Sequence, residues 1–354
     1  MSRPGTIGAA MAHGRAPGLD AIRLCAALSV VISHAWPLSG HAEPVARLTG
    51  LSLGGLAVLV FFALSGFLIA DSAARHRHRK GRFVAARIRR IFPGLLGALC
   101  VTVVIAAACG SDAGWHAQVR YIVKGLSLVS IEHQLAGAFS DNPIPLAVNG
   151  PLWTLAYEVL CYGVIAVLLW LAPGRAGWRV PALTLGALML CLLSATGMLP
   201  AGALGYRLAQ TGPLAFAFGL GALAWQCRQR VVLNGYFAFA LLAAAATLSC
   251  ICRDETAAVL SLAPALGYAA LTIGYSPYGR ALPGDISFGV YIYGWPVAQA
   301  IVHVAGPMAP GALALASCLA VLPFAIVSWV AVERPMLTRG RGIVARERAA
   351  PHGA

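Results

Sequence analysis

Ten long apolar stretches constrain this chain more than any other feature of its sequence. A helix needs about 20 apolar residues to cross a bilayer, and 59% of the 354 residues are hydrophobic while only 11% are charged. Soluble domains carry about 25% charged residues. The sequence therefore predicts an all-α, polytopic membrane protein and excludes a soluble globular enzyme, a disordered chain and a coiled coil. The approximate spans are 19–38, 51–71, 91–110, 151–172, 180–199, 206–226, 231–251, 256–275, 286–306 and 311–332.

The positions of Lys and Arg predict how these helices are oriented. With the N-terminus in the cytoplasm, 20 of the 26 Lys and Arg fall in connections on the cytoplasmic side and 5 on the outer side. Cytoplasmic loops are enriched in these residues, so we expect both termini inside, with an N-terminal tail at 1–17 and a basic tail at 336–354. An apolar run at 24–32 is compatible with a removable signal peptide. The ionisable residues around it favour a permanent helix instead.

The first stretch holds three ionisable residues. Arg23 and His34 are 11 residues apart, so they share one helical face with a rise of about 16 Å. Asp20 lies one turn before Arg23 and can pair with it. Ionisable residues inside a membrane are costly and mark functional sites by default. The structural alternative is an interfacial Asp–Arg pair and a hydrogen-bonded His near the outer surface.

A basic segment at 75–93 precedes the third stretch. Its net positive charge, part of a formal +14 for the chain, suits anionic lipid; nucleic acid is excluded because so little of the chain lies outside a bilayer. Arg87 and Arg90 are spaced i, i+3, so together they can grip a phosphate through paired hydrogen bonds. The alternative is a simple membrane anchor.

Polar residues recur in later stretches. Glu158 must be protonated or partnered if it is buried, and we expect it to meet His34; the alternative is a structural Glu bonded to a Tyr or to the backbone. Ser287 and Tyr291 are spaced i, i+4 and line one stripe, unless Tyr291 belongs to an interfacial aromatic belt. Glu333 is expected to pair with an Arg. The 111–150 connection is long enough to contact an acceptor.

A segment at 61–67, FFALSGF, contains a serine that resembles a nucleophile. Ser65 lacks the strand–turn–helix setting of a nucleophile elbow. We interpret this LSGF sequence as a site of close helix packing.

Taken in order, these segments resemble the acyltransferase-3 family of integral membrane O-acyltransferases. The resemblance runs from about Gly18 to Pro335 and implies a transmembrane acyltransferase domain over 18–335. It rests on a basic residue separated from a His by ten intervening residues, an FFxLSGF span, an RxxR…P element, a PLWxLxxE segment, an SYxxY-like segment and an ERP close. The residues that carry it are Arg23, His34, Phe61 to Phe67, Arg87, Arg90, Pro93, Pro151 to Glu158, Ser287, Tyr291 and Glu333 to Pro335.

The resemblance implies a function. Family members move an acyl group, most often acetyl from cytoplasmic acetyl-CoA, to a hydroxyl of a carbohydrate or lipid-linked glycan at the bacterial inner membrane. By the match, His34 is catalytic with Arg23, Arg87 and Arg90 as its partners, and Arg87 and Arg90 handle CoA. We add Glu158 as a catalytic residue by hypothesis. Trp153, Ser287 and Tyr291 are expected to bind substrate, and no metal is implied. Many members carry a His where this chain has Gly294, so a second His at that place is not required.

Acyl transfer from a thioester needs a base for the acceptor hydroxyl and charge stabilisation for the tetrahedral intermediate. We expect His34 to take the proton, with Glu158 setting its tautomer or charge. A transient acetyl-His34 that relays the group is the alternative. A secondary transporter or flippase for a lipid-linked sugar is the competing class, but no inverted repeat or pair of broken helices is visible in the sequence. A structural partner in polysaccharide assembly is a third possibility.

Overall fold

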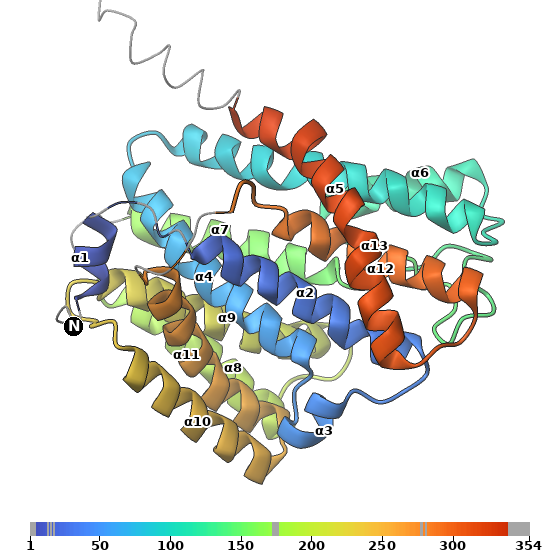
Figure 1. The fold of residues 1–354 in the computed structure, drawn as a ribbon. Coiled ribbons are helices and arrows are strands. Elements are labelled where there is room, and N and C mark those ends of the chain that lie inside the picture. Colours follow the sequence, from blue (N-terminus) through green and yellow to red (C-terminus); the bar gives the residue numbers. More distant parts are fainter. Residues whose placement is uncertain are drawn as a thin grey trace, which may run out of the picture.

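The computed structural model describes residues 5–12, 14, 16, 18–171, 177–276, 279 and 282–338. These residues form a bundle of long helices (Figure 1) with two isolated β-bridges and no strand. Most of the predicted tail at 336–354, and part of that at 1–17, lies outside the described residues. The elements are α1 (Ile7–Ala12), α2 (Leu19–Leu38), α3 (Pro44–Thr49), α4 (Leu53–Arg75), α5 (Lys80–Ala108), α6 (Trp115–Ser127), α7 (Trp153–Leu171), α8 (Arg179–Ala195), α9 (Ala203–Gln226), α10 (Gly235–Cys252), α11 (Glu255–Gly274), α12 (Ser287–Ala305), α13 (Pro310–Val327) and a π-helical turn, Ser328–Glu333.

Each of the ten predicted stretches forms a helix. By length and composition, eight of the described helical segments are long and apolar enough to cross a membrane: α2, α4, α5, α7, α9, α10, α11 and the continuous helix from Pro310 to Thr338. The other two predicted spans correspond to α8, which is shorter, and α12. The expectation of an all-α, polytopic membrane protein is therefore confirmed, while the orientation of the termini remains a prediction.

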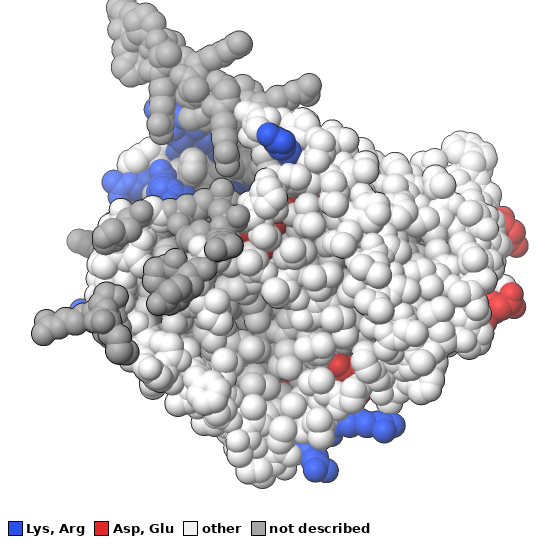
Figure 2. Space-filling view, viewed as in Figure 1, with Lys and Arg blue, Asp and Glu red and all other residues white. Residues whose placement is uncertain are grey.

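The surface has the character of a lipid-facing one. Figure 2 shows a face that is mostly free of charge, with Lys and Arg near its margins. Large apolar side chains such as Val104, Leu171, Phe239 and Val304 are 68%, 70%, 75% and 82% exposed. An apolar surface of this extent is a liability in water and is the expected one in hydrocarbon.

Helix α5 differs most from its predicted bounds. It begins at Lys80, whereas the apolar stretch begins near residue 91. The apolar pattern marks only the part that can lie in hydrocarbon, and the basic residues before it continue the same helix. As a result Arg87 and Arg90 are held on a rigid helix rather than in a loop.

Helix α12 forms the centre of one half of the bundle. Most of its residues are buried, including Tyr291, Gly294 and Gln299. It packs against α2, α5 and α13. A Cβ at Gly294 would lie 2.6 Å from a methyl group of Val31 on α2. Gly294 is thus a close contact between two helices.

The 111–150 connection is folded over the end of α12. Asn142 donates to the side-chain and main-chain oxygens of Gln299 at 2.7 and 2.9 Å. The indole of Trp295 donates to the Ala147 carbonyl at 2.8 Å, and Asn149 donates to the Ile292 carbonyl at 2.9 Å. These buried bonds fix the connection against the helix. Its contact with an acceptor stays a prediction.

Helices α4 and α9 approach each other through paired glycines. A Cβ at Gly66 would lie 1.9 Å from the Phe218 carbonyl oxygen, and one at Gly221 would lie 1.8 Å from the Ala63 carbonyl oxygen. Small residues allow helix backbones to approach this closely in membranes. The interpretation of LSGF as a packing motif is confirmed.

Replacing Gly66 by Ala is expected to destabilise the protein by about 1–3 kcal/mol, the usual cost of overpacking a core. The added methyl group has backbone rather than a movable side chain in its way. The measurement is the thermal denaturation midpoint of the purified protein in detergent. Gly163→Ala is the control, because a Cβ there meets nothing within 4 Å. Equal midpoints for the two variants would contradict the prediction.

Candidate active site

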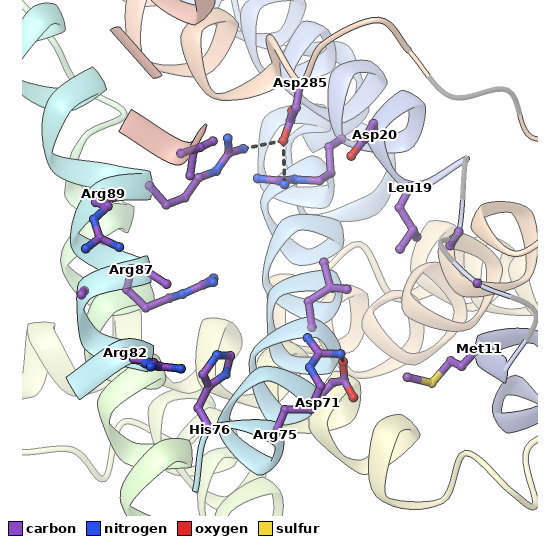
Figure 3. Close-up of a pocket in the computed structure, with 18 of the residues that line it drawn as sticks. Met11, Leu19, Asp20, Asp71, Arg75, His76, Arg82, Arg87, Arg89 and Asp285 are labelled. Atoms are coloured by element: carbon purple, nitrogen blue, oxygen red, sulfur yellow. Dashed lines mark hydrogen bonds and ion pairs between the residues drawn. The ribbon is translucent and has the colours of Figure 1, made fainter. Parts of the chain in front are cut away.

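A basic cavity opens at one end of the bundle. Its volume is about 960 Å³, and six arginines and three aspartates line it. Figure 3 shows Arg82, Arg87 and Arg89 along α5, facing a wall that includes Asp71 and Met11. A cavity with this excess of guanidinium groups is suited to an anion with several phosphates.

Arg87 has no ionic partner among the described residues. Its guanidinium lies over the Phe83 ring, 5.8 Å from the centroid, and its Nε is buried without a hydrogen-bond acceptor. An unpaired buried donor is costly unless a ligand satisfies it. Arg87 therefore presents a cation that the protein itself leaves available.

Arg90, the other member of the predicted pair, is held by carboxylates. It donates to Asp285 and lies 3.7 Å from Glu333 Oε2. Glu333 is only 1% exposed and accepts from Ser328 at 3.0 Å, so its predicted pairing with an Arg is confirmed. The π-helical turn positions this carboxylate, and such turns often occur at functional sites.

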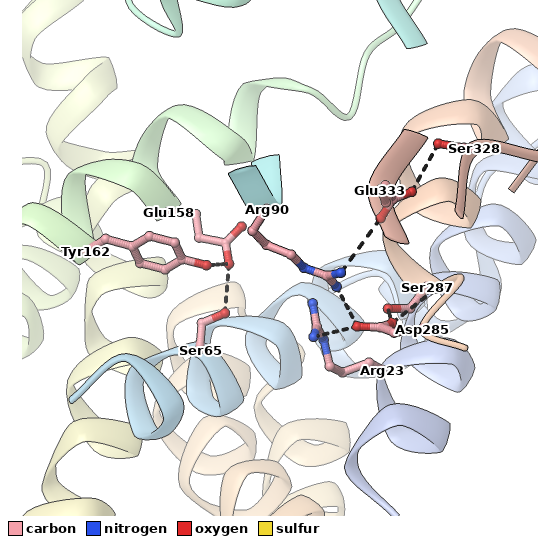
Figure 4. A network of polar contacts seen from close by, with 9 residues as sticks. All are labelled: Arg23, Ser65, Arg90, Glu158, Tyr162, Asp285, Ser287, Ser328 and Glu333. Carbon is pink, nitrogen blue, oxygen red and sulfur yellow. Dashed lines mark hydrogen bonds and ion pairs between the residues drawn. The ribbon is translucent and has the colours of Figure 1, made fainter. Parts of the chain in front are cut away.

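Asp285 links Arg23 on α2 to Arg90 on α5 (Figure 4). The same carboxylate oxygen that accepts from Arg90 also accepts from Arg23 at 2.9 Å, and Ser287 Oγ donates to the other oxygen at 2.5 Å. Burial alone would raise the pKa of Asp285, but the two guanidinium groups hold that pKa well below its usual range. Asp285 is thus an ion-pair partner of Arg23 that the sequence analysis did not predict.

Glu158 has different partners from the predicted one. Its carboxylate accepts from Ser65 Oγ at 2.7 Å and from the Tyr162 hydroxyl at 2.5 Å. It lines a different cavity from His34. The expectation that Glu158 meets His34 is therefore wrong, because the helical position fixed its depth but not the face on which it packs. The structural alternative given in the sequence analysis, a Glu hydrogen-bonded to a Tyr, is the contact that the structure shows.

His34 lines a second cavity of about 270 Å³ together with Trp153 and Tyr291. Its ring has no hydrogen-bond partner among the described residues and packs edge-on against Trp295, 5.0 Å between centroids. The Tyr291 hydroxyl donates to the Pro151 carbonyl at 2.9 Å and lies 2.6 Å from Thr154 Oγ1. The imidazole is thus oriented by packing while its nitrogens remain available to a ligand.

A small third cavity, about 40 Å³, lies between the other two. It shares Arg23 with the basic cavity, and Val58, Thr154 and Tyr291 with the cavity of His34. Its remaining walls are mostly aromatic and aliphatic, together with Glu158 and Ser287. The three cavities therefore form one series through the bundle, and every predicted site residue lines at least one of them.

Comparison with known proteins identifies the family of this chain. Residues 17–332 match the model of the acyltransferase-3 family, described as an acyltransferase domain, and the chain belongs to this family. The assignment makes the protein an acyltransferase and decides against the transporter class.

Three relatives align with nearly the whole chain. An O-acetyl transferase of Shigella phage Sf6 is 31% identical, covering 90% of this chain and 96% of its own. The exopolysaccharide production protein ExoZ of Rhizobium meliloti is 27% identical, covering 88% and 96%. Nodulation protein 10 of Rhizobium leguminosarum bv. viciae is 25% identical, covering 94% and 96%. No solved structure matches the chain.

Proposed function

We propose that this protein transfers an acetyl group from acetyl-CoA to a hydroxyl of a cell-surface or exported carbohydrate, at the bacterial inner membrane. The observation that carries the proposal is the series of cavities, with a basic cavity at one end and His34 at the other. The names of the phage and Rhizobium relatives support the acetyl group and the carbohydrate.

The basic cavity is the proposed donor site. Its arginines suit the phosphates of CoA, and it lies at the end of the bundle that the Lys and Arg distribution assigns to the cytoplasm. The thioester end of the donor then enters the small middle cavity. Glu158, held by Ser65 and Tyr162, offers an acceptor there for an amide N–H of the pantetheine arm.

The cavity of His34 is the proposed acceptor site, and Trp153 offers it an aromatic surface. In the proposed reaction His34 takes the acceptor hydroxyl proton while that oxygen forms a bond to the thioester carbonyl carbon. The carbon–sulfur bond then breaks, and the proton passes from His34 to the departing thiolate. A neutral imidazole is near its optimum as a base at physiological pH. The acetyl-His34 relay stays an alternative route to the same products.

The test is the acetyl content of the host's surface polysaccharide, in a deletion strain with and without the wild-type gene. A second assay identifies the donor: washed membranes are supplied with labelled acetyl-CoA, and the label that reaches the polysaccharide is measured. Restored O-acetylation and transfer of label to the polymer support the proposal. Unchanged acetylation with altered polymer export would reject it.

Replacing Arg87 by Ala is expected to raise the KM for acetyl-CoA by about 10- to 100-fold, the effect of losing hydrogen bonds to a charged group. Arg87 has no other ionic role among the described residues. The measurement is initial-rate kinetics in membranes with donor and acceptor varied separately. Arg77→Ala is the matched control, since Arg77 is exposed and does not line the cavity. A similar KM for both variants would place the donor elsewhere.

A further inference from the structure

Some polar side chains in the cavity of His34 are hydrogen-bonded within the protein, and others are not. Ser52 caps α4 by accepting from the Gly55 amide at 3.0 Å. Thr154 and Tyr291 are bonded to each other and to the Pro151 carbonyl. These bonds hold the walls of the cavity in place.

Two further side chains in this cavity resemble His34 in being unpaired. Gln210 extends from α9 and Glu255 from the first turn of α11. Neither side chain has a hydrogen bond or an ion pair with any described residue, although both can make several. Together with His34 on α2, they bring three available polar groups from three helices to one cavity.

The charge of the cavity is equally distinctive. Glu255 is the one Asp, Glu, Lys or Arg among the residues that line it, whereas six arginines line the basic cavity. A carboxylate on a ligand would therefore meet a like charge and find no Lys or Arg among the residues that line the cavity. Sugar hydroxyls, in contrast, can donate to the Glu255 carboxylate and to the Gln210 side-chain oxygen.

We propose that Gln210 and Glu255 bind the acceptor in the cavity of His34, and that the sugar ring that receives the acetyl group carries no negative charge. This inference rests on the proposed function and adds the recognition of the acceptor to it. Gln210 and Glu255 determine specificity by holding neighbouring hydroxyls. His34 then acts on the hydroxyl that this position brings to it.

The test is two-substrate kinetics with the full-length protein in membranes. The donor is labelled acetyl-CoA, and the acceptor is unacetylated surface polysaccharide from the deletion strain. Gln210→Ala and Glu255→Gln are each expected to raise the KM for the polysaccharide about tenfold. The first substitution removes a hydrogen bond, and the second replaces a charge-assisted hydrogen bond by a weaker neutral one. The KM for acetyl-CoA is expected to stay unchanged in both, because neither residue lines the basic cavity.

Thr211→Ala and Thr256→Ala are the matched controls, since each is adjacent to a tested residue and neither lines the cavity. An unchanged KM for the polysaccharide in both test variants overturns the inference, and so does an equal rise in both KM values. Glu255 is exposed, so its isosteric replacement does not threaten the fold.

A second measurement addresses the charge directly. Nuclear magnetic resonance of the polysaccharide from the wild-type strain identifies the ring that carries the acetyl group. An acetylated neutral sugar or amino sugar supports the inference, and an acetylated uronic acid overturns it. If the wild-type protein transfers no acetyl group from acetyl-CoA to the polymer, the proposed function itself fails, and this result is distinct from both outcomes.

Discussion

The His34→Gln variant is expected to lose acyl transfer by about a hundred- to ten-thousandfold, the usual contribution of a general base. Glutamine keeps much of the volume that packs against Trp295 but cannot accept the proton. The KM for acetyl-CoA is expected to change little, because His34 lies in a different cavity from the arginines. The measurement is the initial rate of label transfer at equal protein level.

His303→Gln serves as the matched histidine control. His303 lies in the last turn of α12, contacts Phe139, and lines none of the three cavities. Wild-type rates in the His34 variant would refute its catalytic role and favour a structural one. Rapid quenching with donor alone distinguishes the two routes, since only the relay accumulates an acetyl group on His34.

Asp285→Asn is expected to lower the free energy of unfolding by about 3 kcal/mol, the lower end of the cost of breaking a buried ion pair. The substitution leaves the guanidinium groups of Arg23 and Arg90 without their shared anion. We expect the lower end of this energy range because the Arg23 side chain is 24% exposed and water can partly solvate its charge. The measurement is reversible denaturation in detergent micelles, combined with the donor KM.

Glu132→Gln is the control for this prediction. Glu132 also accepts from two cations, Arg120 and Lys124, but their side chains are 62% and 40% exposed. Exposed ion pairs contribute about 0–1 kcal/mol, so this variant is expected to be nearly as stable as the wild type. If the two substitutions lowered the free energy of unfolding equally, the buried ion pairs of Asp285 would stabilise the protein no more than exposed ones, and the prediction would be wrong.

The length of the apolar stretches predicted the long helices, because the thickness of the bilayer requires about 20 apolar residues in each of them. The same criterion could not find the start of α5, where the residues are basic, or the short helices α3 and α6. Their stability comes from packing and capping, such as the Glu43 carboxylate that accepts from the Ala46 amide. The length of a hydrophobic run contains no information about such contacts.

The sequence predicted some residues of the site but not the contacts between helices that are distant in the chain. Motif positions identified His34, Arg87 and Trp153 as site residues, and each lines a cavity of the series. Asp285 was missed because a single Asp before an apolar run has no partner nearby in sequence. The pairing of Glu158 was missed because it depends on which helices pack together, and Ser65 lies 93 residues away.

The bond between Arg23 and Asp285 spans 262 positions of the chain, and this separation has a consequence for how the protein is made. At about 5–20 residues per second, the ribosome needs roughly 13–50 s after Arg23 to produce its counter-ion. Until then Arg23, on α2, is without this counter-ion. Assembly of the donor cavity is thus a late event in biogenesis, completed only when the last long helix has added Trp329 and Leu337 to the lining.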